Sequence, residues 1–261
     1  MIDTSSPTSG MLPIVSTERK EGWTRFLQPV GLGIILLISI FMNFYQLGQN
    51  GFANTYYASA VRSMLDSWHT FFFVFLDPVG FVTVDKPPLG FWLQVASAKI
   101  FGFTPFSVFF PQALAGVLSV LLLYHLVRRH FGVVAGLLAA LALAVSPISV
   151  VTNRNNTIDS TLVLTMLLGA WTVVKAAETG KWRWLMLTAV LVGLGFNIKM
   201  LEAYLVVPAY ALLYLLVSCT EKLEDAYCTT AGCRTRDANH FVIMGGCGRP
   251  HSSLTTPLCR F

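Results

Sequence analysis

Long apolar blocks constrain this sequence more than any other feature. Five stretches come close to the roughly 20 mostly apolar residues that a helix needs to cross a bilayer, and a sixth follows a short polar break. They are 26–47, 107–127, 133–151, 158–174, 184–196 and 203–217. A mean hydropathy of +0.63 and only 12% charged residues exclude an ordinary soluble domain. Because lipid offers backbone groups no partner, we expect an all-α integral membrane protein, a partial polytopic bundle of about six transmembrane helices.

The run 88–103 decides the topology. It is short, contains Lys99 and begins with Pro88 after Pro87, so it could cross the membrane or lie along its surface. If it lies flat, basic residues concentrate on the side of the amino terminus; if it crosses, that excess disappears. The positive-inside rule favours the flat arrangement. We therefore predict a multi-pass cell-membrane protein with a cytoplasmic amino terminus, an outer loop 48–106 and one or two interfacial helices at the outer face.

Composition divides the chain into three parts. Residues 1–25 are rich in Ser, Thr, Pro and Gly before the first apolar block and are expected to form a cytoplasmic disordered tail. Residues 26–218 form the expected transmembrane domain. All five cysteines lie in 219–261, where the composition changes abruptly to Cys, Gly, Thr and Arg. Their spacing fits no strong zinc motif. From the change of composition we expect this last part to be a non-native or disordered tail of a frameshifted or truncated gene.

The stretch VTVDKPPLGFW places two opposite charges, Asp85 and Lys86, directly before Pro-Pro and two aromatic residues. One interpretation is that both are solvated loop charges that flank a helix. The other is that the aromatic residues hold them at headgroup depth, where a lysine is a point-charge donor for a lipid phosphate. The two charges could also neutralise each other.

Several segments together resemble a known family. GFANTYYASAVRSM (51–64), VDKPPLGFWLQVASAKIFG (84–102), RNNTIDS (154–160) and GFNIKMLEAY (195–204) are similar to the amino-terminal half of bacterial integral-membrane glycosyltransferases. These belong to the superfamily of protein O-mannosyltransferases and aminoarabinose lipid A transferases. The resemblance covers about residues 26–217, and it implies transfer of a sugar from a polyprenyl-phosphate donor to an extracytoplasmic acceptor, which can be a lipid, a glycan or a protein.

The resemblance also implies roles for single residues. Lys86 matches the lysine of the family's KPP motif and is expected to bind the lipid phosphate, whose developing charge a fixed cation stabilises. Asp85 matches a position that resembles a catalytic or metal-binding carboxylate, so a divalent cation, Mg or Mn, is a possible cofactor. Asn54 occupies the place of an acidic residue taken to be the general base, and an amide cannot accept a proton in that way. Either Asp85 takes over that role, or the acceptor needs no strong base, or the chain is inactive; Asn54 would then bind a sugar hydroxyl or be a turn residue.

Three further charged residues are candidates for substrate binding. The Arg154 guanidinium group could bind phosphate in a bidentate manner, while Asp159 orients the guanidinium group or binds sugar hydroxyls. Alternatively, Asp159 is an acidic residue in the first turn of a helix, where the helix dipole favours it. Lys199 could supply a second cation or pair with Glu202 at spacing i, i+3. Nothing indicates a nucleic-acid partner. The alternatives to an enzyme are an inactive truncated fragment, a non-catalytic membrane protein and, less favoured, a transporter, which would place polar residues at mid-membrane.

Overall fold

The structure is a computed structural model that describes residues 19–49 and 51–216, with side chains from residue 28 onward. Of the expected disordered tail 1–25, residues 1–18 lie outside the described residues, whereas 19–25 belong to a helix. The expected tail 219–261, with all five cysteines, lies outside the described residues. The chain divides into two compact units. Unit 1 comprises residues up to 58 together with 96–160, and unit 2 comprises 59–95 together with the chain from 161 onward.

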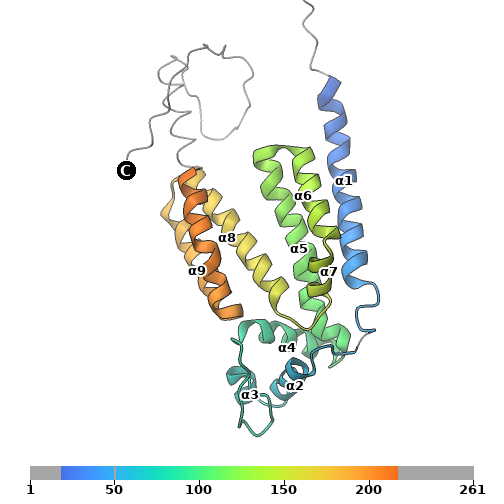
Figure 1. Cartoon of the computed structure of the whole chain (residues 1–261), viewed down its shortest axis with the longest axis vertical. Helices are drawn as coiled ribbons and strands as arrows, with labels where there is room; N and C mark the ends of the chain where they lie inside the picture. Colours follow the sequence, from blue (N-terminus) through green and yellow to red (C-terminus); the bar gives the residue numbers. More distant parts are fainter. Residues whose placement is uncertain (1–18, 50, 217–261) are drawn as a thin grey trace, which may run out of the picture. The chain divides into compact units, whose positions relative to one another are not determined.

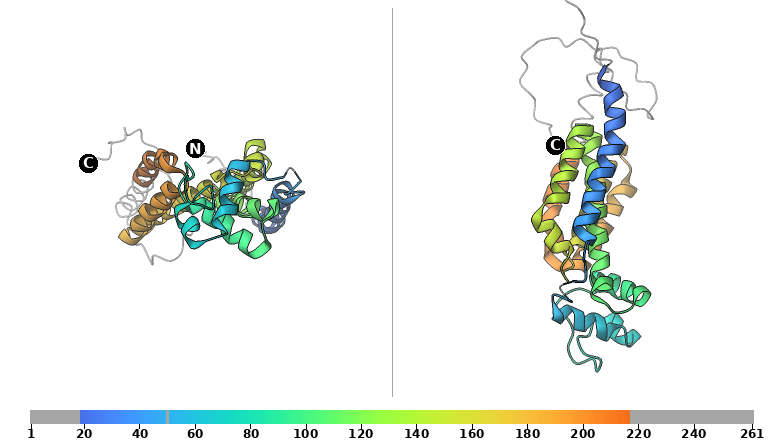
Figure 2. Two further views of the ribbon diagram at one scale, coloured as in Figure 1. Left: turned by 90° about the horizontal axis from the view of Figure 1, so that it is seen from below. Right: turned by 90° about the vertical axis from the view of Figure 1, so that its right-hand side faces the viewer.

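Unit 1 is a group of packed helices (Figure 1). It contains α1 (Arg19–Phe44), α5 (Pro105–Phe131), α6 (Val133–Val145) and α7 (Pro147–Asn153). Figure 2 shows α1 lying along α5 and α6, and α1 contacts both. The apolar centre between these helices consists of Ile35, Val120, Tyr124, Ala140 and Ala144.

Local sequence signals explain where α5 begins and ends. The Thr104 side chain accepts a hydrogen bond from the Ser107 backbone N–H, and Ser107 Oγ accepts one from the Thr104 N–H, which together form a capping box. Pro105 follows in the first turn, where a missing N–H costs nothing. The helix ends at Gly132, whose φ of 88° reverses the chain into α6. These signals give a tight antiparallel helix pair.

The end of α1 and the start of α5 meet at one end of unit 1. The ring centroids of Phe44 and Phe110 lie 5.8 Å apart. A Cβ added to Gly48 would lie 3.4 Å from the backbone nitrogen of Phe106. The chain between α1 and α5 therefore leaves and rejoins unit 1 at the same end.

Unit 2 is also helical. It contains most of α2 (Thr55–Met64), α3 (Trp68–Phe73), the start of α4 (Leu89–Phe101), nearly all of α8 (Asp159–Thr179), and α9 (Trp182–Lys199), which continues into the 3₁₀ helix η1 (Met200–Val206) and a helical stretch to residue 216. Met200 has φ 42° and ψ −126°, which ends α9. A Cβ on Gly195 would lie 3.2 Å from Ala203 Cβ, so η1 packs back onto the end of α9.

The all-α membrane fold class is confirmed, but the count of spans differs. Within the part of the chain that the structure describes, three stretches are long and apolar enough to cross a membrane, namely Pro105–Phe131, Asp159–Thr179 and Trp182–Leu216. The pair α6 and α7 is bent by 58° and would make a fourth. The expected spans 184–196 and 203–217 thus fall in one helical stretch, and the apolar part of α1, Gln28–Phe44, is shorter than a full span.

Two details add to the expected organisation. The block 133–151 is not one straight helix, because Pro147 lacks the N–H that would continue α6 and starts α7 instead. The segment between α1 and α5 contains three short helices, α2, α3 and α4, rather than one or two. At 13 residues, α4 is about 20 Å long, less than the roughly 30 Å hydrocarbon thickness.

Candidate functional site

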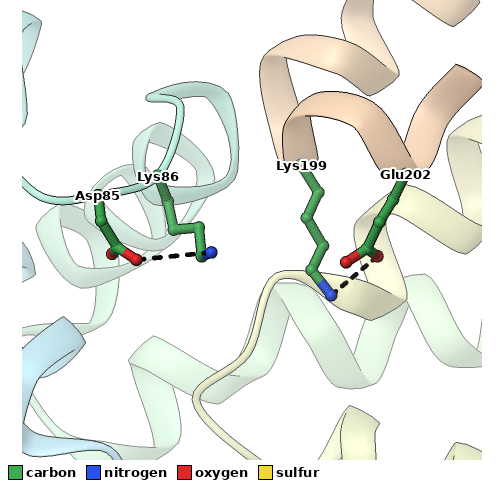
Figure 3. Close-up of polar contacts among 4 residues, drawn as sticks. All are labelled: Asp85, Lys86, Lys199 and Glu202. Atoms are coloured by element: carbon green, nitrogen blue, oxygen red, sulfur yellow. Dashed lines mark ion pairs between the residues drawn. The ribbon is translucent and has the colours of Figure 1, made fainter.

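The Asp85–Lys86 turn immediately precedes α4 in unit 2. Lys86 Nζ lies 3.5 Å from the Asp85 carboxylate, so the two neighbours form an ion pair (Figure 3). The side chain of Asp85 is 62% exposed and that of Lys86 30% exposed, so both are within reach of a ligand. The neutralised pair considered from the sequence is thus observed. An exposed pair of this kind is worth at most about 1 kcal/mol, so an incoming phosphate can compete for the ammonium group.

Asn54 stands directly before α2 and caps it. Its Oδ1 accepts hydrogen bonds from the backbone N–H groups of Tyr56 at 3.1 Å and Tyr57 at 3.4 Å. This oxygen therefore satisfies donors that a helix start would otherwise leave without partners. The Asn54 oxygen is thus engaged as a helix cap, and a role in sugar binding, which stays a prediction, would use its amide nitrogen.

The loop after α7 brings several polar groups to the same end of unit 1. Asn156 is fully buried, and its Nδ2 donates to the backbone oxygen of Asn54 at 3.1 Å. Arg154 Nη1 donates to the backbone oxygen of Met42 at 3.2 Å, near the end of α1. Asp159 is the first residue of α8, as expected for an acid in the first turn. Arg154 thus holds α1 in addition to any role with a substrate.

A buried asparagine pair fixes this loop, and the sequence analysis did not identify it. Asn153 Nδ2 donates to Asn43 Oδ1 at 2.9 Å, and Asn43 Nδ2 donates to the backbone oxygen of Ser39 at 2.7 Å. Gly116 provides the space, because a Cβ there would lie 2.5 Å from Asn153 Cγ. The available signal was Asn43, a strongly polar residue inside the apolar run IFMNFYQL.

Lys199 and Glu202 form a further ion pair of unit 2. Their charged atoms lie 2.9 Å apart across the break between α9 and η1 (Figure 3), which confirms the pairing expected from the i, i+3 spacing. Met200, with its positive φ, turns the chain between them. The lysine is therefore held by its neighbour, and its use as a second cation would require that Glu202 release it.

The candidates divide between the units. Asn54, Arg154 and Asp159 belong to unit 1, whereas Asp85, Lys86 and Lys199 belong to unit 2. Within unit 1, Asn156 links Asn54 to the loop that carries Arg154.

The donors around Asp85 do not fit a metal centre. Within the described residues, no three His, Cys, Asp or Glu side chains gather closely enough to hold a metal ion. The Lys86 ammonium group lies 3.5 Å from the Asp85 carboxylate and repels a cation. We therefore derive no step through a divalent ion.

Comparison with known proteins extends this description. The family described as "Dolichyl-phosphate-mannose-protein mannosyltransferase" matches residues 85–232, more than half of the chain, and its match begins at the Asp85–Lys86 turn. No solved structure matches.

Two similar proteins come from Bacillus subtilis (strain 168). "Putative mannosyltransferase YycA" is 50% identical over 185 residues, which are 71% of this chain and 27% of the relative. "Putative mannosyltransferase YkcB" is 46% identical over 185 residues, which are 71% of this chain and 26% of the relative. An uncharacterized protein of Aquifex aeolicus (strain VF5) is 32% identical over 146 residues, which are 53% of this chain and 28% of the relative. The chain thus spans about a quarter of the length of these relatives. On the family match, and on the motifs that carried the resemblance, the chain belongs to the dolichyl-phosphate-mannose-protein mannosyltransferase family.

Proposed function

We propose that this chain contributes the membrane part of a glycosyltransferase that moves a sugar from a polyprenyl-phosphate donor to a cell-envelope acceptor outside the cytoplasm. The observation that carries the proposal is Lys86, a partly exposed ammonium group in a proline turn at the start of the family match. Its charge is balanced by an exposed carboxylate, and a phosphate can replace that partner. Its position before α4 is the place where the family resemblance expects the lipid phosphate.

The reaction follows from the donor's chemistry. An acceptor oxygen forms a bond to the anomeric carbon while the bond from that carbon to the phosphate oxygen breaks, and the electron pair leaves with the phosphate. Lys86 offsets the negative charge that develops there. At about 4 Å and an effective dielectric constant near 20, such a contact is worth about 4 kcal/mol before desolvation. The acceptor hydroxyl loses its proton, and Asp85 is the proposed base because Asn54 has no basic oxygen.

The arrangement of unit 1 supports a site on the outer face. Because α1 ends where α5 begins, as the Phe44–Phe110 contact shows, the intervening segment crosses the membrane either not at all or an even number of times. Among the described residues of that segment, α4 is the single apolar helix of 10 residues or more. A flat α4 therefore accounts for the contact, and the positive-inside rule assigns that face to the exterior.

The proposal can be tested with membranes that contain the expressed chain. A photoreactive polyprenyl phosphate reports binding, and a radiolabelled polyprenyl-phosphate sugar reports transfer. We expect Lys86→Ala to reduce photolabelling by about 10- to 100-fold, which corresponds to roughly 1.4 to 2.7 kcal/mol, and Lys86→Arg to retain part of it. Lys181→Ala, an exposed lysine just before α9, is the matched control and should bind normally.

The outcomes separate the alternatives. Labelling that is equal in the parent chain and Lys86→Ala would overturn the role of Lys86. Binding that depends on Lys86 without any transfer would identify the chain as a binding part that does not catalyse alone, which is the inactive-fragment alternative. Movement of the lipid across the membrane without transfer would favour a transporter.

A further inference from the structure

The segment between α2 and α4 carries an unusual density of exposed apolar side chains. Val79 is 83% exposed, Phe81 88% and Trp68 74%, and Phe72 and Phe73 are each about half exposed. We call these five residues the aromatic face. They lie outside every described stretch that is long and apolar enough to cross a membrane. Exposed apolar groups this close together mark an interaction surface.

The aromatic face is continuous from α3 to the turn that follows it. The Phe75 ring packs on His69 at 5.2 Å and on Phe73 at 6.0 Å. On its other side, Phe75 contacts Gly80, where an added Cβ would lie 3.5 Å from the ring. A hollow of about 500 Å³ lined by Trp68, His69, Phe72 and Phe73 opens in the same segment. The rings therefore join the helix and the turn into one body.

Several backbone N–H groups in and next to the turn 77–82 are hydrogen-bonded within it. The Asp77 carboxylate accepts from the Phe81 N–H at 3.1 Å and from the Val82 N–H at 2.9 Å. The Val82 carbonyl accepts from the Leu76 N–H at 2.8 Å, and the Gly80 N–H donates to the Asp77 carbonyl at 3.2 Å. A backbone that enters an apolar medium needs internal partners, and these bonds provide them for the N–H groups of Leu76, Gly80, Phe81 and Val82.

Charge is nearly absent from this surface. Between Asp66 and Asp85 the sequence contains one acidic residue and no Lys or Arg. That residue is Asp77, whose carboxylate is directed at the backbone N–H groups of its own turn. A surface without charge gives no electrostatic recognition of a partner protein, whereas Trp and Phe are the residues that favour the boundary between headgroups and acyl chains.

We propose that the aromatic face inserts into the headgroup–acyl boundary of the bilayer and anchors the outer segment there. The segment continues directly into α4, an apolar helix of 13 residues that is shorter than a membrane span. This inference is independent of the proposed reaction. It concerns the rigid α3–turn body and not the spanning helices.

Depth measurement by spin labelling tests the anchor. The chain, with its five native cysteines replaced by serine, carries Phe81→Cys or Val79→Cys and a nitroxide label, in vesicles of phosphatidylethanolamine and phosphatidylglycerol. Both positions are highly exposed, so the substitutions leave packing intact. We expect collisions with oxygen to exceed collisions with a water-soluble nickel complex several-fold. The label on Asp66→Cys, an exposed position outside the aromatic face, should show the reverse ratio.

Two results would overturn the proposal. Preferential collision of the labels at 79 and 81 with the nickel complex would place the aromatic face in water. Shielding from both oxygen and nickel would show that protein covers it, either a second copy or another partner. Agreement between the two labels separates insertion of the surface from a local effect of one label.

Discussion

Replacing Gly116 with alanine should destabilise unit 1 by about 1 to 3 kcal/mol. The new Cβ would lie 2.5 Å from Asn153 Cγ, so Asn153 must move and lose its 2.9 Å hydrogen bond to Asn43. Overpacking costs about 1 to 3 kcal/mol, and a hydrogen bond between membrane helices about 0.6 to 1.7. The higher helix propensity of alanine returns about 0.8 to 1.0.

The measurement is the free energy of unfolding in mixed micelles of detergent and sodium dodecyl sulfate, followed by tryptophan fluorescence. Gly33→Ala is the matched control, because Gly33 also lies in a helix of unit 1 but has no atom within 4 Å of an added Cβ. That variant should be neutral or more stable, by up to about 1 kcal/mol.

A double variant makes the reasoning refutable. Asn153→Ala removes the side chain that the new methyl group would meet, so Gly116→Ala should cost little or nothing in that background. The coupling energy between the two substitutions should therefore exceed about 1 kcal/mol. An equal cost of Gly116→Ala with and without Asn153 would refute the steric explanation and place the effect elsewhere in α5.

Three further predictions concern other contacts. Hydrogen bonds from the backbone N–H groups of Val82 and then Phe81 hold the pKa of Asp77 below its usual value. The turn should therefore stay ordered at any pH above the ordinary aspartate pKa of about 3.9. Order should be lost only when the pH falls through the lower pKa that Asp77 has in the folded protein. A nitroxide at position 79 should report that loss, and Asp77→Asn should remove its pH dependence. Thr188→Val removes the 2.9 Å contact with Thr172 and should cost about 0.6 kcal/mol in unfolding experiments; a loss above about 3 would contradict a single bond between helices. Asn54→Asp keeps a side-chain oxygen that can cap α2 and adds a carboxylate that can accept a proton. If the enzyme lacks a general base, the rate of sugar transfer should rise by about 10-fold or more. An unchanged rate would show that no general base is needed.

The apolar blocks determined most of the helices. In α5 and α8 the boundaries follow the sequence within a few residues, because a capping box with Pro105, and an acidic residue at Asp159, mark their starts. The ion pair of Lys199 and Glu202 was also predictable, since it depends only on residues three apart in the chain. The family resemblance was also predictable, because it depends on short motifs and on their order along the chain, which the sequence shows directly.

Only the tertiary structure shows which side chains of different helices contact one another. Asn153 and Asn43 are 110 residues apart in the chain, and nothing local to either one shows that Gly116 leaves room for their contact. The aromatic face likewise depends on Phe75 packing between α3 and Gly80, which requires the turn that Asp77 closes. Periodicity and composition report which residues avoid water, whereas the partner of a buried amide depends on which helices approach closely enough to exclude both water and lipid from it.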